Sequence, residues 1–143
     1  MSLVLVLDQL EQLAVELVAV TNAAIFDVGA GDLSLLQWRT LMVLGGSDEP
    51  LRVNELADRA SASMPSASRL IRRMERRGLV SVSRDPSDGR GRRIALTQAG
   101  EALRSNVIGR RRFLIEESLG ALPPDPALIA GLEDVVARMA RWR

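Results

Sequence analysis

The sequence predicts a mainly α-helical fold with one small β-hairpin, and three observations carry that prediction. Apolar residues recur at steps of three and four through most of the chain, which is the period of an amphipathic helix. A helical run rich in arginine ends at Gly78. Two short alternating segments then follow at residues 80–84 and 93–97, separated by a polar loop at 85–92. Alternation of this kind is typical of an antiparallel pair with one buried face.

Length and composition limit the classes of function. The 143 residues suit one domain, or one domain with helical extensions, and an apolar fraction of 47% is enough for a core. The sequence contains neither cysteine nor histidine. Their absence excludes thiol redox sensing and removes the commonest metal ligand and general base. Glycine-rich phosphate loops are also absent. We therefore expect no enzyme, no metal and no cofactor.

The apolar segments do not predict a membrane protein. No uninterrupted apolar run reaches the ~18 residues of a spanning helix. The apolar start, residues 1–13, lacks a basic region and is interrupted by Asp8 and Glu11, so a signal peptide is not expected. We expect a cytoplasmic protein with no membrane partner.

Charge is unevenly distributed along the chain. The net charge is only +1, yet residues 52–93 hold eleven arginines against five acidic residues. Every basic residue is arginine, which a lysine-poor proteome would explain, but the clustering needs another reason. Segregated positive charge points to a module that faces a polyanion.

The first and last helices have the same character. Residues 3–28 are expected to form one long helix, and a final helix follows a break at 120–126. Both carry an apolar stripe at steps of three and four residues. Packing within the monomer would explain the first stripe, but two such stripes favour contact between two copies of the chain. We therefore predict dimerisation helices in residues 1–32 and 101–143. The stripes are Val6, Leu10, Leu13, Leu17, Val20 and Ala24, and then Leu128, Leu132, Val135, Met139 and Trp142.

Residues 33–100 are expected to hold three helices and the hairpin. Helices are predicted at 33–44, 52–60 and 64–77. Ser34 and Ser63 suit helix N-caps, Pro65 suits a first turn and Gly78 suits the position just after a helix. Thr97 is expected to cap a further helix at 98–119. Two short helices joined by a tight turn, the second basic and opened by small polar residues, are typical of a helix-turn-helix.

The basic helix and the hairpin together suit two grooves of DNA. The helix alone would be explained by a solvated face, but the hairpin tip is basic as well and has no hydrophobic anchor. We predict that Arg90 enters the minor groove, where Asp88 could orient its guanidinium by a charge-assisted hydrogen bond. The predicted DNA-binding residues are Ser63, Ser66, Ser68 and Arg69 at the major groove, Arg72 and Arg73 at phosphates or scaffold partners, and Asp88, Arg90 and Arg92 in the hairpin.

These segments resemble the MarR family of bacterial winged-helix transcription regulators. The matching stretches are residues 33–44, 52–60, 66–80 and 83–100, and Asp88-Gly89-Arg90 occupies the family's Asp-x-Arg wing motif. The resemblance implies a homodimer on a palindromic double-stranded DNA operator, in most members a repressor released by a small phenolic or lipophilic ligand. The middle wing position, usually basic in the family, is Gly89 here. Arg92 and Arg93 could compensate for the missing charge.

The resemblance also implies a ligand pocket between the dimer layer and the winged helix. Our candidates there are Phe26, Trp38, Met42, Arg112 and Phe113, although Trp38 and both phenylalanines would serve equally as ordinary core. Two other functions remain open: a winged helix used as a protein-interaction module, and a small-molecule-binding protein without specific DNA binding.

Overall fold

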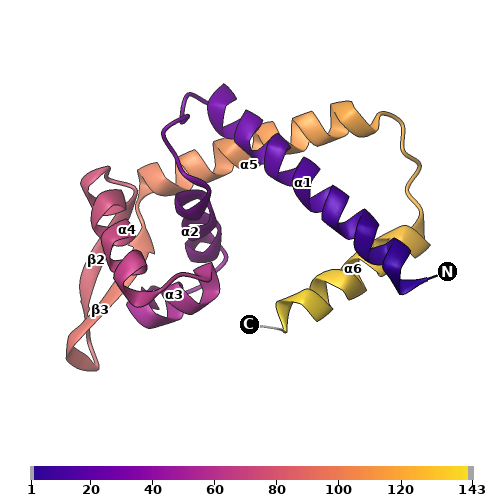
Figure 1. Ribbon diagram of the computed structural model, residues 1–143. Helices are drawn as coiled ribbons and strands as arrows, with labels where there is room; N and C mark the ends of the chain where they lie inside the picture. Colours follow the sequence, from indigo (N-terminus) through magenta and orange to yellow (C-terminus); the bar gives the residue numbers. More distant parts are fainter. Residues whose placement is uncertain (1, 142–143) are drawn as a thin grey trace.

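The computed structural model describes residues 2–141 and contains six helices and a small sheet (Figure 1). Trp142, the predicted end of the last apolar stripe, lies outside the described residues. In chain order the elements are α1 (Leu3–Asp27), α2 (Leu35–Gly45), β1 (Leu51–Arg52), α3 (Val53–Ala60), α4 (Met64–Arg76), β2 (Val80–Asp85), β3 (Asp88–Leu96), α5 (Gln98–Leu119) and α6 (Pro126–Ala140).

The long helix α5 connects two parts of the molecule (Figure 1). At one end it contacts α2 and β3, within a lobe made of α2, α3, α4 and the sheet. The C-terminal part of α1 crosses and contacts α5 near the middle of that helix, and the far end of α5 leads through a loop to α6. The core of the lobe draws one nearly inaccessible side chain from each of five elements: Leu41, Leu56, Met74, Ile94 and Val107. This shared core holds α4 against the sheet.

The predicted helix ends are confirmed by their hydrogen bonds. The Ser34 hydroxyl accepts from the Gln37 N–H at 3.2 Å, and the Gln37 side chain accepts from the Ser34 N–H at 2.8 Å. Ser63 Oγ caps α4 by accepting from the Ser66 N–H at 3.3 Å. Gly78 follows the C-cap of α4 with a positive φ of 70°, a conformation that glycine adopts without steric cost.

The hairpin is longer than the sequence pattern indicated, and the predicted loop at 85–92 is wrong. Strand β3 begins at Asp88, so only Pro86 and Ser87 separate the two strands. Both the N–H and the hydroxyl of Ser87 donate to Asp85 Oδ1, at 3.0 and 2.8 Å, and this pair of bonds closes the turn. Glycine and arginine dominate the start of β3, and these residues give no apolar alternation to recognise.

A short strand, β1, was not predicted. It pairs antiparallel with β3, so that the three-stranded sheet has the order β1-β3-β2. Leu51 lies opposite Ile94, and Arg52 lies opposite Arg93. A strand of two residues is too short to show a period of two, so it leaves no signal in the sequence.

Helices α1 and α6 expose most of their apolar residues. No residue of α6 is buried, and the buried residues of α1 are Thr21, Ala24 and Ile25, all near its C-terminal end. Within residues 2–141, none of the helices combines the length and the apolar character that a membrane span requires. Side chains that remain at least two-fifths exposed include Leu3, Val6, Leu13 and Leu17 of α1, and Leu128, Leu132, Val136 and Met139 of α6.

Two glycines of α5 give a matched test of this packing. A Cβ at Gly100 would overlap the carbonyl oxygen of Leu79, whereas a Cβ at Gly109 would meet no atom within 4 Å. We expect Gly100→Ala to lower the free energy of unfolding by about 1–3 kcal/mol through overpacking. Gly109→Ala should raise it by about 0.5–1 kcal/mol, because alanine restricts the unfolded chain. Urea unfolding at one fixed protein concentration measures both, and a stabilised Gly100→Ala variant would contradict the close approach.

Candidate nucleic-acid interface

Helix α4 presents a basic face to solvent. Its inward stripe, predicted from the sequence and confirmed here, buries Ala67, Leu70, Ile71 and Met74. The polar residues therefore point outward along the rest of the helix surface. The caps described above leave the first turn of α4 open to a partner, since Ser63 is exposed and Ser66 and Ser68 are half-buried. Four outward arginine side chains are exposed: Arg69, Arg72, Arg73 and Arg76.

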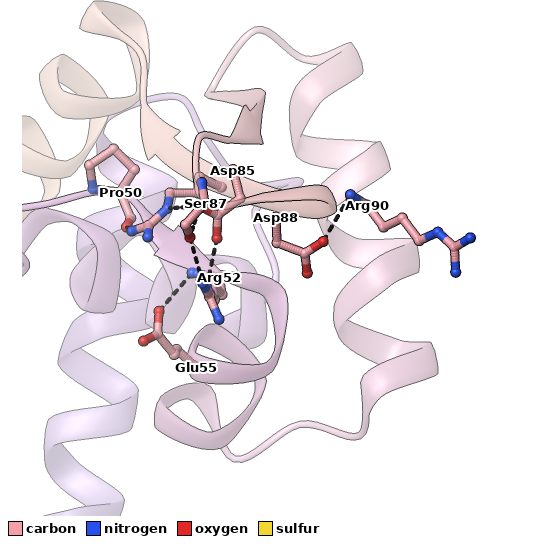
Figure 2. A network of polar contacts seen from close by, with 8 residues as sticks. Pro50, Arg52, Glu55, Asp85, Ser87, Asp88 and Arg90 are labelled. Carbon is pink, nitrogen blue, oxygen red and sulfur yellow. Dashed lines mark hydrogen bonds and ion pairs between the residues drawn. The ribbon is translucent and has the colours of Figure 1, made fainter.

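The hairpin, or wing, is tied to the lobe through the carboxylate of Asp85 (Figure 2). The Asp85 side chain is fully buried, and its Oδ2 lies 2.7 Å from Arg52 Nε. Its Oδ1 lies 3.3 Å from Arg93 Nε. Arg52 also donates from Nη2 to the Ser87 hydroxyl at 3.0 Å. Two strands and the turn between them are thus joined to β1 by one carboxylate.

Both arginines of this network have further partners. The Arg52 N–H donates to Glu55 Oε2 at 2.8 Å, which caps α3 (Figure 2). Arg93 Nη1 donates to the Pro50 carbonyl at 3.2 Å. Arg93 is therefore committed to holding the base of the wing, and the expectation that it compensates for Gly89 at the tip is wrong. We call the set Asp85, Arg52, Arg93 and Ser87 the wing anchor.

The wing anchor keeps its carboxylate ionised. The backbone N–H of Ser87, followed by its hydroxyl, lowers the pKa of Asp85 well below its ordinary value of 3.8. Arg93 and Arg52 lower this pKa further, while burial opposes them. Hydrogen bonds and cations that favour the ionised carboxylate stabilise the folded state at every pH at which the carboxylate is ionised. The wing base is therefore electrostatically fixed at neutral pH.

Asp88 and Arg90 interact differently from the prediction. The backbone N–H of Arg90 donates to Asp88 Oδ1 at 3.1 Å, and the guanidinium of Arg90 extends away from Asp88 into solvent (Figure 2). The expectation that Asp88 orients this guanidinium is therefore wrong. Asp88 shapes the backbone at the tip instead, and the side chain of Arg90 is left exposed beside Gly89.

The arginines fall into two kinds according to their partners. Within residues 2–141, six arginines form ion pairs with carboxylates: Arg52, Arg77, Arg93, Arg104, Arg110 and Arg138. In the same part of the chain, no ion pair with a carboxylate forms at Arg69, Arg72, Arg73, Arg90 or Arg92, the arginines predicted to meet DNA. The α4 face and the wing tip therefore carry positive charge that the described protein does not neutralise.

The candidate ligand residues differ widely in their exposure. Trp38 is 5% exposed and belongs to the core, Met42 is half-buried, and Phe26 and Phe113 are 76% and 48% exposed. Arg112 is exposed on α5. The cation that lies over the Trp38 ring is Arg111, with its Cζ 5.4 Å from the ring centroid. Burial, then the neighbouring Arg112, lowers the pKa of Arg111.

Sequence reasoning missed the wing anchor, although it singled out the hairpin beside it. Arg52 and Asp85 lie on different elements, and the first belongs to the strand that the pattern did not reveal. The only local signal was the Asp-Pro-Ser sequence at 85–87, which favours a turn closed by the aspartate side chain.

Comparison with known proteins gives a consistent classification. Residues 31–91 match the MarR family model. Over 69 residues the chain is 30% identical to the HTH-type transcriptional repressor IacR of Pseudomonas putida, a match covering 48% of this chain but only 41% of that repressor. Over 108 residues it is 27% identical to the HTH-type transcriptional regulator YfiV of Bacillus subtilis (strain 168), covering 73% of this chain and 67% of that protein.

Solved structures share the whole fold. RV1404 from Mycobacterium tuberculosis superposes with a TM-score of 0.85 at 22% identity, covering 98% of this chain and 95% of that one. CouR from Rhodococcus jostii RHA1, bound to p-coumaroyl-CoA, superposes with a TM-score of 0.73 at 22% identity, covering 93% of this chain and 90% of that one. A MepR mutant of S. aureus bound to an oligodeoxyribonucleotide superposes with a TM-score of 0.66 at 20% identity, covering 92% of this chain and 93% of that one. At these identities the likeness shows a common fold.

The wing anchor predicts an acid-dependent stability. Because the pKa of folded Asp85 is lowered, its contribution is present above pH ~3.8 and is lost as pH falls from there toward the folded value. Asp85→Asn should lower the free energy of unfolding at pH 7. The difference in this free energy between the variant and the native protein should become smaller below pH 4. Urea unfolding between pH 2.5 and 7 measures this at fixed protein concentration. A difference in unfolding free energy that stays constant over that pH range would show that ionisation of Asp85 does not stabilise the fold.

Proposed function

Because the chain belongs to the MarR family of winged-helix transcriptional regulators, we propose that it is a cytoplasmic homodimer that represses transcription from a palindromic operator. A small lipophilic or phenolic ligand would release it from DNA. The observation that carries this proposal is the set of exposed arginines without carboxylate partners on α4 and the wing. Phosphates are the natural counterions of such a surface, and their neutralisation makes binding dependent on salt.

The division of labour within the interface follows from the side chains. The N-terminal residues of a recognition helix contact base edges, and small polar side chains allow the helix to approach closely. We assign Ser63, Ser66, Ser68 and Arg69 to the major groove on this basis. Arginine can bind guanine with two hydrogen bonds, so Arg69 is the candidate for base readout among them. Arg72 and Arg73 lie farther along α4 and are assigned to phosphates.

The wing is assigned to the minor groove. Within residues 2–141 no carboxylate forms an ion pair with Arg90, whose guanidinium points away from Asp88 at the tip. A narrow minor groove attracts an inserted guanidinium. Arg92 follows two residues later on β3 and adds charge at the edge of the same groove. Asp88 contributes by holding the backbone at Arg90 rather than by touching DNA.

The exposed apolar faces of α1 and α6 support a homodimer. In water these surfaces favour burial, and a second copy of the chain supplies the same faces by two-fold symmetry. Residues 1–32 and 101–143 are the proposed dimerisation segments, and residues 33–100 the DNA-binding region. A two-fold dimer would place its recognition helices about one turn of DNA apart, roughly 34–36 Å, which is why a palindromic operator is proposed.

The effector site is proposed near the junction of α1, α2 and α5. CouR, a structural neighbour, is bound to p-coumaroyl-CoA, and this chain has Phe26, Trp38, Met42, Arg112 and Phe113 on those three helices. Aromatic rings and cations suit an aromatic ligand that carries negative charge. Release from DNA would require the ligand to favour a dimer geometry that does not fit the operator, because only differential affinity shifts a population.

The Arg90→Ala variant tests the assignment of the wing. The probe is a duplex selected by the native protein from a random pool, and binding is measured by gel shift. We expect the variant to lose affinity by about tenfold or more, since a charge-assisted hydrogen bond contributes roughly 1.5–3 kcal/mol. Arg138→Ala, on exposed α6, is the matched control and should bind as the native protein does. Mass measurement checks that both variants stay dimeric.

Two results would contradict the proposal. Native affinity in dimeric Arg90→Ala would remove the wing from the interface. A native protein that enriches no sequence from the pool, and whose binding does not change with salt, would favour an interaction or ligand-binding module without specific DNA recognition.

A further inference from the structure

A hollow of about 410 Å³ separates α4 from the wing. Its floor is apolar, formed in part by Ile71 of α4 and Val82 of β2. Its rim carries Arg72 from α4 on one side and Arg92 from β3 on the other. Glu75 contributes a carboxylate to the lining, but it forms no ion pair with either arginine within the described chain. The hollow is therefore a groove with cations on both walls.

The register of the hairpin places a second arginine beside Arg92. Arg84 of β2 lies directly opposite Arg92 of β3 in the antiparallel ladder, and both are exposed. Residues two apart on a strand share a face, so strand alternation puts Arg84 on the same face as Val82. The hollow itself is lined by Arg92 and not by Arg84, which borders a second hollow beside Pro50 and Arg93. Like charges directly opposite each other destabilise an antiparallel pair. Nowhere in residues 2–141 does a carboxylate form an ion pair with Arg84 or Arg92 to relieve this repulsion.

The geometry of duplex DNA determines what would fill the groove. The proposed function puts α4 in the major groove and the wing tip in the adjacent minor groove. One sugar–phosphate backbone separates these two grooves along its whole length. When both elements are inserted, that backbone must pass between α4 and the wing, across the hollow lined by Arg72 and Arg92.

We propose that Arg84, Arg92 and Arg72 form a seat for the phosphodiester backbone between the two grooves, and that Arg84 is a DNA contact in addition to those predicted from the sequence. This inference rests on the proposed function, because it needs both elements to be inserted. The ligand is the phosphate group of the backbone, whatever the base sequence. Arg84 therefore contributes affinity and register, while α4 and Arg90 supply sequence preference.

Arg84 should affect the stability of the free protein and its affinity for DNA differently from a residue that only supports the fold. Without DNA, the Arg84–Arg92 pair is repulsive and opposes folding of the wing. With DNA, phosphates lie between the guanidinium groups and offset the repulsion. Removing the charge of Arg84 should therefore change free-protein stability and DNA affinity in opposite directions.

Arg84→Gln and Arg84→Glu test the seat. The matched control is Arg138→Gln, an exposed arginine outside the apolar stripe of α6, and mass measurement checks that all three variants stay dimeric. Affinity for a duplex selected by the native protein is measured across salt concentrations, as is affinity for a duplex of unrelated sequence. Since a dimer holds two copies of Arg84, Arg84→Gln should reduce the slope of log K against log salt by about 2. Its affinity for both duplexes should fall by the same factor. Arg138→Gln should leave the slope and both affinities unchanged.

Thermal unfolding of the free protein is the second readout. Arg84→Gln should raise Tm by about 1–4 °C, since a like-charged cross-strand pair is removed. Arg84→Glu should raise it further, because an attractive pair with Arg92 replaces a repulsive one, and should weaken DNA binding more than Arg84→Gln does.

The outcomes separate this inference from the proposed function. An unchanged salt slope in Arg84→Gln, with salt-dependent binding in the native protein, would overturn the seat and leave the proposed function standing. A lowered Tm would show that Arg84 supports the wing structurally and would also overturn it. A loss confined to the selected duplex would make Arg84 a base-reading residue instead. If the native protein shows no salt-dependent DNA binding, the proposed function itself fails.

Discussion

Asp85 places a fully buried carboxylate where β2 turns toward β3, and two guanidinium groups and one serine hold it there. Removal of one partner from a buried charge network leaves the remaining charges uncompensated, so the stability of the wing base depends on every member of the network. Arg52 ends β1 and is the N-cap residue of α3, and Arg93 belongs to β3. The network therefore links the wing to the helix-turn-helix. We infer that the angle between α4 and the wing, and with it the hollow between them, depends on this anchor.

The same residue type serves two purposes in this chain. Arginines at the wing base, at the α1–α5 contact and within α5 are paired with carboxylates and stabilise the fold. Among the residues that the structure describes, the arginines on the outward face of α4 and at the wing tip form no ion pair with a carboxylate. The surface of α4 and the wing tip is therefore strongly basic although the net charge is only +1, because most acidic residues lie in other parts of the chain. Uncompensated charge opposes folding of the free protein, and a polyanion offsets that cost on binding.

Local patterns in the sequence predicted local structure well. Helix periodicity, the capping serines and Gly78 located α2, α3 and α4, and the buried stripe of α4 followed from spacing alone. What escaped prediction depends on residues far apart in the chain: β1, the early start of β3 and the pairing of Arg52 and Arg93 with Asp85. Asp88 was recognised as part of the tip, but its acceptance of the Arg90 backbone N–H rather than the guanidinium requires coordinates. The roles assigned to the α4 residues remain predictions.

Hydroxyl-radical footprinting of the native dimer and of Asp85→Asn, on a duplex selected by the native protein, tests most directly whether the anchor aims the wing. The account predicts that the variant keeps protection where α4 enters the major groove but loses protection of the sugars that flank the outer minor grooves. An unchanged footprint, or a uniform loss of protection at every position, would contradict it.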